Sequence, residues 1–286
     1  MIFKLFCCLF QNFYYNINDM CKPIKKFIQC RNCPYKDKGG PQAGYYYSTY
    51  DGVQVVVECD CHKKWAEETK LEAKFLNSNV NADYSFDNYC GNTSRDSVDC
   101  LKKVAENPDK FIYKKMIYMY GPNGTQKTSM ALALGKELII KGYTVQYTLM
   151  SDLITNLVND FSDSPTTKEK KEYFINKCMD CDFLIIDEAF DLSKVTIYAS
   201  GYQIPYLDTF IRNRFEINKK SIIFISNKRP SDIAKVPPAR PNEPQKEGFG
   251  ISLQSLVERN TKQSFLEFTD RWVDNVNQID PHGLFR

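Results

Sequence analysis

The sequence predicts an α/β fold in which a parallel sheet is flanked by helices, preceded by a small β unit with one helix. Three observations support this fold. Apolar strands alternate with helical stretches in the second part of the chain, a glycine-rich loop pattern follows the first of those strands, and four cysteines stand in two close pairs upstream. A chain of 286 residues, of which 43% are apolar, can bury one sizeable core and still build a smaller unit.

Charge and cysteine usage narrow the functional classes. The net charge is only +3, so no global basic field indicates nucleic-acid binding, and any such contact must come from local patches. Eleven cysteines are present, and apart from the two close pairs they are scattered. This distribution fits a reducing compartment better than a disulfide framework, so we expect a cytoplasmic protein.

The N-terminal residues 1–20 form an extension before the first organised sequence. The apolar run in "MIFKLFCCLFQNFYYNIND" is shorter than the roughly 20 residues that span a bilayer, and no small-residue cleavage site follows it. A second methionine, Met20, precedes the next segment. We therefore interpret residues 1–20 as an upstream extension of the reading frame, and we expect no membrane partner.

Three further segments follow this extension. Residues 21–77 are expected to form a small module, because "GVQVVVE" from Gly52 to Glu58 alternates like a strand and "HKKWAEETKLEAKFL" from His62 to Leu76 has helical spacing. Residues 78–100 are rich in Asn, Asp and Ser and are expected to form a linker. Residues 101–286 then form the α/β domain.

The cysteine pairs of the small module have the spacing of a zinc site. "CRNC" supplies Cys30 and Cys33, and "CDCH" supplies Cys59 and Cys61, with a β run between the two pairs. Four thiolates can close a tetrahedral Zn²⁺ site, which would replace the core that so small a unit cannot build. His62 is an alternative fourth ligand to either cysteine of the second pair, because the Cys-x-Cys spacing strains the chelate.

The α/β domain is expected to alternate strands and helices. One helix is expected from Ser151, in "SDLITNLVNDF", and another from Thr166, where Glu169 completes a capping box behind Pro165. The expected strands are Met116 to Tyr120, Val145 to Leu149, Phe183 to Ile186 and Ile222 to Ser226.

The pattern "GPNGTQKT" follows the first of these strands and precedes a helix, which is the context of a phosphate-binding loop. Its backbone N–H groups would cradle the phosphates of ATP, Lys127 would neutralise the β and γ charges, and Thr128 would offer its hydroxyl to Mg²⁺. The candidate nucleotide-binding residues are Gly121, Pro122, Asn123, Gly124, Thr125, Gln126, Lys127 and Thr128.

One residue departs from the phosphate-loop pattern, because Gln126 stands where glycine is expected. We expect a side chain to be tolerated there only if the backbone is already helical and the glutamine points away from the phosphates. Slower hydrolysis and intact binding are both compatible with this change.

A second motif, "FLIIDEAF", ends a buried strand in two carboxylates. Asp187 is placed to hold Mg²⁺ at the carboxyl edge of the sheet, and Glu188 to polarise the attacking water. A third motif, "SIIFISN", puts Asn227 at the tip of another buried strand, where its side chain would orient that water. The competing interpretation of Asn227 is an ordinary cap after a strand.

With these motifs in this order, the region from about Asp83 to Arg271 resembles the AAA+ ATPases of the DnaC and DnaI helicase-loader group, to which IstB is related. The stretches "IRNRFEINKKSIIFISN" and "SLVERNTKQSFLEFTDRW" carry the resemblance together with the phosphate loop and "FLIIDEAF". The resemblance implies an ATPase whose partners are a replicative hexameric DNA helicase and single-stranded DNA. It also implies that the zinc module grips the helicase.

The same resemblance assigns an arginine that acts in trans on a neighbouring subunit's ATP. In the family this arginine lies in a helix reading like "LVER", which places it at Arg259, with Arg212 and Arg214 as competing candidates. We expect the helical lid of most AAA+ proteins to be missing or vestigial, as in the loaders. Such a protein is expected to self-associate on its partner or on DNA.

Two further clusters, one of lysines and one of cysteines, lie in the α/β domain. The stretch from Ser151 to Lys177 occupies the place where initiators and loaders insert helices that touch single-stranded DNA, although a lysine cluster is more often a solvated face. Its lysines are Lys168, Lys170, Lys171 and Lys177. "CMDC", Cys178 to Cys181, has metal-type spacing but no second pair, and we interpret it as core or turn packing.

The expected function is therefore that of an ATP-dependent loader of a replicative DNA helicase. One alternative is an IstB-like transposition accessory ATPase, which would prefer duplex DNA. Another, motivated by Gln126, is a non-hydrolysing zinc adaptor in which the nucleotide is structural.

Overall fold

The computed structural model describes residues 44–158, 163–195, 203–235 and 248–270. The chain divides into two compact units, Met1–Lys74 and Phe75–Arg286. The predictions for residues 1–20, Cys30 and Cys33 lie outside the described residues. Among the residues that are described, no helix has the length and apolar character needed to cross a membrane.

The first unit contains a β-hairpin followed by a helix. Strands β1 (Tyr45–Tyr50) and β2 (Val53–Glu58) pair antiparallel, and Asp51 and Gly52 form the two-residue turn with positive φ at both positions. Helix α2 (Asp60–Ser78) follows directly. The predicted strand and helix are confirmed within two residues, whereas β1 was missed because "YYYSTY" does not alternate apolar and polar residues.

The second unit is built on a five-stranded parallel sheet in the order β4-β5-β6-β3-β7, which confirms the predicted fold class. Its strands are β3 (Met116–Tyr120), β4 (Val145–Leu149), β5 (Phe183–Asp187), β6 (Ser221–Ser226) and β7 (Phe265–Glu267). The four predicted strands match within one residue. Strand β7 was missed because three residues are too few to show a period.

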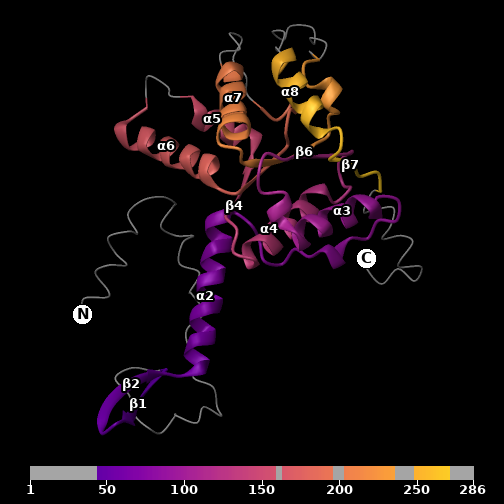
Figure 1. Ribbon diagram of the computed structural model, residues 1–286. Coiled ribbons are helices and arrows are strands. Elements are labelled where there is room, and N and C mark those ends of the chain that lie inside the picture. The colour runs from indigo at the N-terminus through magenta and orange to yellow at the C-terminus, as the bar shows by residue number, and fades with distance from the viewer. Residues whose placement is uncertain (1–43, 159–162, 196–202, 236–247, 271–286) are drawn as a thin grey trace, which may run out of the picture. The chain divides into compact units, whose positions relative to one another are not determined.

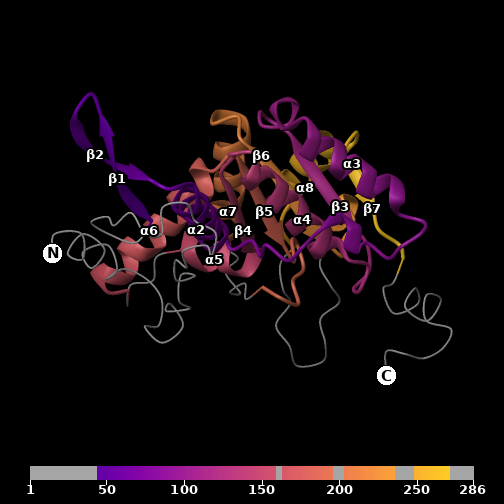
Figure 2. The same ribbon diagram turned by 90° about the horizontal axis from the view of Figure 1, so that it is seen from below.

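Helices cover both faces of the sheet. Figure 1 shows α3 and α4 on one face and α5, α6, α7 and α8 on the other, and Figure 2 gives the view from below. The helices are α3 (Arg95–Glu106), α4 (Lys127–Ile140), α5 (Met150–Leu157), α6 (Pro165–Asp180), α7 (Gln203–Arg212) and α8 (Ile251–Thr261). Shorter turns are η1 (Phe86–Asn88), η2 (Pro108–Lys110), the π-helical η3 (Asn213–Ile217) and η4 (Pro230–Asp232).

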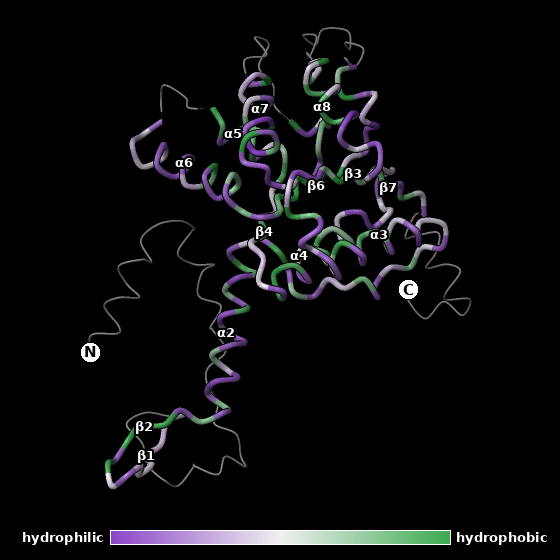
Figure 3. The backbone as a smooth tube through the Cα atoms, viewed as in Figure 1, coloured by the Kyte–Doolittle hydropathy of each residue, from purple (hydrophilic) through white to green (hydrophobic). Residues whose placement is uncertain are grey.

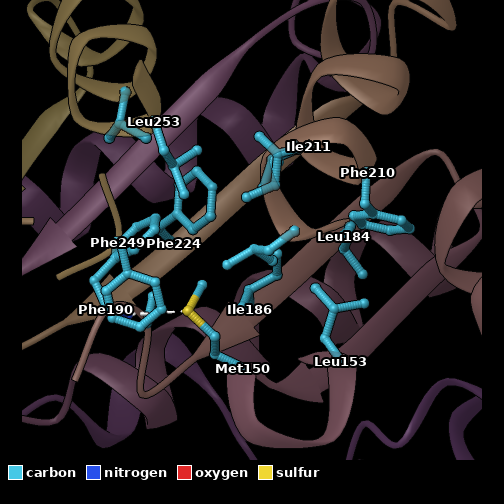
Figure 4. Packing of buried hydrophobic residues seen from close by; sticks show 14 of the residues in the cluster. Met150, Leu153, Leu184, Ile186, Phe190, Phe210, Ile211, Phe224, Phe249 and Leu253 are labelled. Atoms are coloured by element: carbon cyan, nitrogen blue, oxygen red, sulfur yellow. Dashed lines mark hydrogen bonds between the residues drawn. The ribbon is translucent and has the colours of Figure 1, made fainter. Parts of the chain in front are cut away.

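The core lies where alternate strand residues meet the helices. Leu184 and Ile186 of β5 and Phe224 of β6 pack in one cluster with side chains from α5, α7 and α8 (Figure 4). Within this cluster Phe190 contacts Phe224, with ring centroids 5.1 Å apart. Strands β5 and β6 are buried along their whole length, and their residues are apolar apart from Asp187 and the two terminal serines of β6 (Figure 3), as expected for a sheet buried on both faces.

Two predicted helix starts are wrong. Helix α6 is capped by Ser164, whose hydroxyl accepts a hydrogen bond from the Thr167 N–H at 3.2 Å. Pro165 therefore occupies the first helical position, where its missing N–H costs nothing, and Thr166 is not the cap. Helix α5 begins at Met150 without a side-chain cap, so Ser151 lies inside it.

Two predictions about domain organisation stay predictions. The expected linker 78–100 contains η1 and the start of α3, and its Asn79 side chain donates to the Tyr147 carbonyl at 3.4 Å. After β6 the described residues form η4, α8 and β7. Residues 271–286 are not described, so the expected missing or vestigial lid is not tested.

Candidate nucleotide-binding site

The predicted site residues meet at the carboxyl edge of the parallel sheet. Strands β3, β5 and β6 are neighbours, so the segments that follow them converge there. They enclose an open cavity of about 290 Å³. Its lining comprises Asn123, Gly124, Thr125, Gln126, Lys127, Thr128, Ser129, Asp187, Glu188, Asp191, Lys194, Ile225, Ser226 and Asn227.

Residues Gly121 to Gln126 connect β3 to α4, whose first two residues are Lys127 and Thr128. A Cβ atom on Gly121 would lie 2.0 Å from the carbonyl oxygen of Phe268, so only glycine fits this position. Gly124 has a φ of +79°, which glycine adopts without strain. Because α4 begins at Lys127, its N-terminal dipole and backbone N–H groups favour an anion at this end of the helix.

The expected helical backbone at Gln126 is wrong, whereas the expected direction of its side chain is confirmed. Its φ of 62° and ψ of 17° are left-handed, not right-handed helical, which costs a non-glycine residue roughly 1–2 kcal/mol. Its side chain does point away from the loop: Oε1 accepts from the Cys90 N–H at 3.0 Å and Nε2 donates to the Asn88 carbonyl at 3.1 Å. Two such bonds contribute about 1 kcal/mol each, enough to offset the backbone cost.

Lys127 is buried, with 6% of its surface exposed. Its amine donates to the carbonyls of Gly121 and Pro122, both at 2.7 Å, and to Thr125 Oγ1 at 3.3 Å. Burial lowers the pKa of this amine to about 8, while the nearby Asp187 carboxylate acts in the opposite direction. A buried cation held by neutral carbonyls fits an anionic ligand, because phosphate oxygens would replace them as stronger partners.

Asp187 is held by three donors. Thr128 Oγ1 and the Tyr147 hydroxyl both donate to its Oδ2, at 2.8 and 2.9 Å, and the Glu188 N–H donates to its Oδ1 at 2.7 Å. Thr128 and Asp187 thus share a hydrogen bond and can both face a divalent cation, as the sequence predicts. Burial, and then the Asp187 charge, raise the pKa of Tyr147, so its hydroxyl remains a donor.

Tyr147 was missed by sequence reasoning. The pairing of β4 with β5 explains its position, because the register sets Tyr147 opposite Ile185, two residues before Asp187. Without that register, a tyrosine inside a strand predicts only packing.

The two remaining predicted residues, Glu188 and Asn227, also line the cavity. Glu188 has a φ of 50°, and its carboxylate lies 3.6 Å from the Lys194 amine. Asn227 donates from Nδ2 to Asn123 Oδ1 at 2.7 Å, which connects the tip of β6 to the phosphate loop. Asp191 and Lys194, which line the cavity, were missed because no strand or loop pattern marks them.

Two of the arginine candidates, Arg259 and Arg212, lie outside the lining of this cavity. Arg259 on α8 is exposed, and its guanidinium lies 3.5 Å from the Glu216 carboxylate. Arg212 pairs with Asp208 at 3.0 Å and with the same Glu216 at 3.4 Å. The lining of the cavity includes neither residue.

Arg214, a candidate for the arginine that acts in trans, is instead a structural residue. It is fully buried, and its guanidinium donates to backbone carbonyls at the end of α6 and the start of β6. The accepting residues are Cys178, Met179, Cys181, Asp182 and Ser221, at 2.8, 2.8, 2.9, 3.3 and 2.8 Å. A side chain used in this way cannot reach a neighbouring subunit.

The lysines of α6 differ in their exposure to solvent. Lys171 is mostly buried and bridges Asp163 at 2.6 Å and the Val158 carbonyl at 2.8 Å. Lys177 donates to the Asn77 carbonyl, and burial lowers its pKa. Lys168 and Lys170 are exposed. The predicted cluster of four is therefore reduced to two residues on the solvent side of the helix.

The cysteine pair at the end of α6 is part of the core, whereas the pair at the start of α2 is not part of that core cluster. Cys178 and Cys181 are buried in the core cluster, as predicted for "CMDC", and burial raises the pKa of both thiols. Cys59 and Cys61 lie at the start of α2 with sulfurs 2.9 Å apart, and His62 Nδ1 contacts Glu58 Oε1 at 2.5 Å. Across the described ranges, which omit residues 1–43, no group of three metal-binding side chains is found.

Curated proteins similar to this chain are bacterial initiators of chromosome replication. The chromosomal replication initiator protein DnaA of Aliarcobacter butzleri is 30% identical over 195 residues, covering 66% of this chain and 42% of the relative. DnaA of Onion yellows phytoplasma is 26% identical over 167 residues, covering 57% of this chain and 30% of the relative. The chain therefore spans less than half the length of these relatives.

Solved structures show the same fold. AMPPCP-bound DnaA from Aquifex aeolicus superposes with a TM-score of 0.51 at 21% identity, covering 71% of this chain and 54% of that one. A replication initiator DnaA bound to AMPPCP and single-stranded DNA superposes with a TM-score of 0.52 at 20% identity, covering 72% and 58%.

The family model that matches is the bacterial DnaA ATPase domain, over residues 80–240. The prediction of an AAA+ ATPase domain like those of replication proteins is therefore confirmed. The family that matches, however, is that of the initiator DnaA and not that of the helicase loaders. Since the match covers more than half of the 286 residues, this protein belongs to the family of the bacterial DnaA ATPase domain.

Proposed function

We propose that this protein binds and hydrolyses ATP with Mg²⁺ and uses the cycle to place a replicative DNA helicase on single-stranded DNA. The observation that carries the ATPase part is the convergence of Lys127, Thr128, Asp187, Glu188 and Asn227 at one sheet edge, around one cavity. The helicase and DNA parts rest on kinship and on the predicted zinc module.

Each side chain of the site has a proposed role. Lys127 moves from the Gly121 and Pro122 carbonyls to the β- and γ-phosphates, because an anion is a stronger partner for a buried ammonium than a carbonyl is. Thr128 and Asp187 hold Mg²⁺, directly or through its water ligands. Glu188 accepts the proton of the attacking water, and Asn227 orients that water. The metal, when bound, neutralises charge on the phosphate oxygens.

The decisive experiment separates binding from hydrolysis. Purified wild-type protein and Glu188→Gln are compared for ATP affinity by calorimetry and for phosphate release with single-stranded DNA present. We expect similar affinities and a fall in turnover of about 100-fold or more, as for loss of a catalytic acid–base group. Glu106→Gln is the matched control, because its exposed carboxylate at the end of α3 lies outside the cavity lining and its loss should leave turnover unchanged.

The rival interpretation, a non-hydrolysing adaptor, has one observation in its favour. Gln126 replaces the glycine of the phosphate-loop pattern and has a left-handed backbone. If wild type binds ATP but shows no turnover, and Glu188→Gln changes nothing, the adaptor is correct. If neither protein binds ATP, both interpretations fail.

The DNA partner is proposed on two grounds. One of the similar initiator structures holds single-stranded DNA. In this chain, Lys168 and Lys170 lie exposed on α6, where they could neutralise phosphates. Titration of single-stranded and duplex DNA at several salt concentrations tests this proposal, and a preference for duplex would instead support the transposition-accessory alternative.

Arg259 is proposed to act in trans on the ATP of a neighbouring copy, which requires self-association on DNA or on the partner. Its exposure on α8 and its weak surface pairing with Glu216 support this role. Mixing Glu188→Gln protein with Arg259→Ala protein tests it. Partial recovery of turnover in the mixture, compared with either variant alone, is expected only if each subunit supplies a different residue to a shared site.

The N-terminal module is proposed to hold zinc through Cys30, Cys33, Cys59 and Cys61 and to bind the helicase. The neighbouring sulfurs of Cys59 and Cys61 fit the second half of such a site, with His62 beside them as the alternative ligand. A pull-down of the cognate helicase by intact protein, and by protein cut near residue 80, tests this role. Equal capture by both would contradict it.

A further inference from the structure

Gln126 occupies a backbone conformation that suits glycine, so its side chain needs a reason to be there. The residue precedes Lys127 directly, and both line the cavity of the candidate site. The side chain is only partly exposed and turns away from the cavity toward the chain segment 84–94. It contacts that segment with both ends of its amide.

The two amide contacts are mutually consistent. The Cys90 N–H can only donate and the Asn88 carbonyl can only accept, so the Gln126 oxygen must face Cys90 and its nitrogen must face Asn88. The resulting clamp bridges residues separated by 36 and 38 positions in the chain. It holds the exit of η1, whose entry is capped by Ser85 through the Asp87 N–H at 3.2 Å.

A second anchor of the 84–94 segment does not involve the phosphate loop. Asp270 accepts from the Tyr89 hydroxyl at 3.1 Å, from the Thr93 N–H at 2.7 Å and from the Ser94 N–H at 2.9 Å. Burial acts to raise the pKa of Asp270, but the hydrogen bonds from Thr93, Ser94 and Tyr89 outweigh it and lower the pKa. The segment is therefore held both by a carboxylate after β7 and by Gln126, and the Tyr89 contact of Asp270 lies between the two residues that Gln126 contacts.

This arrangement connects the segment to events at the phosphate loop. The Lys127 amine is held by the carbonyls of Gly121 and Pro122, so its transfer to a phosphate would release the beginning of the loop. Gln126 lies next to Lys127 in the chain, and its side chain would transmit any change of the loop backbone to Asn88 and Cys90. Glycine at this position would have no side chain with which to do so.

We propose that Gln126 is a positioning residue that couples nucleotide occupancy of the phosphate loop to the 84–94 segment. The inference rests on the proposed nucleotide binding. In the absence of nucleotide, the clamp protects the Cys90 amide from exchange. In its presence, the clamp transmits the rearrangement of the loop to the segment.

Hydrogen exchange of the full-length protein tests both statements. Wild type and Gln126→Gly are first titrated with AMPPCP and Mg²⁺, and exchange is compared without nucleotide and at saturation. Without nucleotide, we expect the peptide containing Cys90 to exchange about tenfold faster in Gln126→Gly, since two hydrogen bonds are lost. With nucleotide, wild type should change its exchange across 84–94, and Gln126→Gly should not.

A control variant loosens the same segment from its other end. Thr93→Val removes the hydroxyl contacts of Thr93 to Thr269 and Asp270 and leaves the Tyr89 contact and the clamp in place. Exchange near Ser94 should rise, but the nucleotide response at Cys90 should persist.

Three outcomes overturn the proposal in distinguishable ways. Equal exchange of wild type and Gln126→Gly without nucleotide removes the clamp. An equal nucleotide response in the two proteins removes the coupling alone and leaves nucleotide binding intact. Failure of wild type to bind any nucleotide removes the proposed function, and the coupling with it.

Discussion

Replacing Arg214 by methionine should destabilise the second unit strongly. The guanidinium is fully buried and donates to five backbone carbonyls, four of them within 2.9 Å. Methionine fills a similar volume but donates nothing, so these carbonyls would lose their partners inside the core. Breaking a buried charged network typically costs 3–5 kcal/mol, and we expect a loss of about that size.

Two comparison variants make this estimate specific. Lysine keeps the charge and three donors, so Arg214→Lys should lose about half as much. Arg259→Met instead removes an exposed side chain on α8 that pairs with Glu216 at 3.5 Å. Surface pairs contribute about 0–1 kcal/mol, so this variant should remain close to wild type.

The assay is urea unfolding followed by circular dichroism, with the slope m compared between variants. A loss of 3–5 kcal/mol would be a large fraction of the total for a domain of ordinary stability. If Arg214→Met unfolds within about 1 kcal/mol of wild type and at the same time loses ATP turnover, the structural interpretation of Arg214 is wrong and a catalytic role must be restored.

Three further predictions follow from the site and the predicted metal module. The pKa of Lys127 is about 8 in the free protein, against an ordinary value of 10.5. A bound phosphate should raise that pKa, so ATP binding above pH 8 should take up a proton. ATP affinity should therefore fall between pH 8 and 10 and stay level just below pH 8. Calorimetry in buffers of different ionisation enthalpy measures the number of protons taken up on ATP binding. Absence of proton uptake at pH 9 would contradict the lowered pKa of Lys127. Replacing both Lys168 and Lys170 by Gln should reduce the affinity for single-stranded DNA. The slope of log affinity against log salt concentration should become less steep by about 1.4, because each lost phosphate contact contributes roughly 0.7. An unchanged slope would exclude α6 from the interface. The purified protein should contain one Zn²⁺ per chain by elemental analysis, and Cys59→Ser with Cys61→Ser should abolish it. Full zinc content in that double variant would exclude this cysteine pair as ligands.

Much of the fold and part of the site were predictable because they depend on short-range patterns. The run "FLIID" is apolar over a strand's length and ends in a carboxylate, so both β5 and the position of Asp187 at the sheet edge follow from local sequence. The phosphate loop is recognisable for the same reason, since glycine spacing between a strand and a helix reflects the local backbone.

The failures that concern side-chain contacts between distant segments share one physical cause. Tyr147 contacts Asp187 across two paired strands, and its role depends on their register. Arg214 looks like any arginine near the end of a helix until the end of α6 and the start of β6 surround it with carbonyls.

The sequence alone therefore determined the α/β class, the main strands of the sheet, and the identity of the phosphate loop and the acidic pair, because hydrophobic period and glycine spacing act within a few residues. The tertiary structure decided that Arg214 is structural, that Tyr147 holds Asp187, and that Gln126 clamps a segment 36 residues before it in the chain. Those properties depend on which distant groups burial brings together, and no local pattern encodes that.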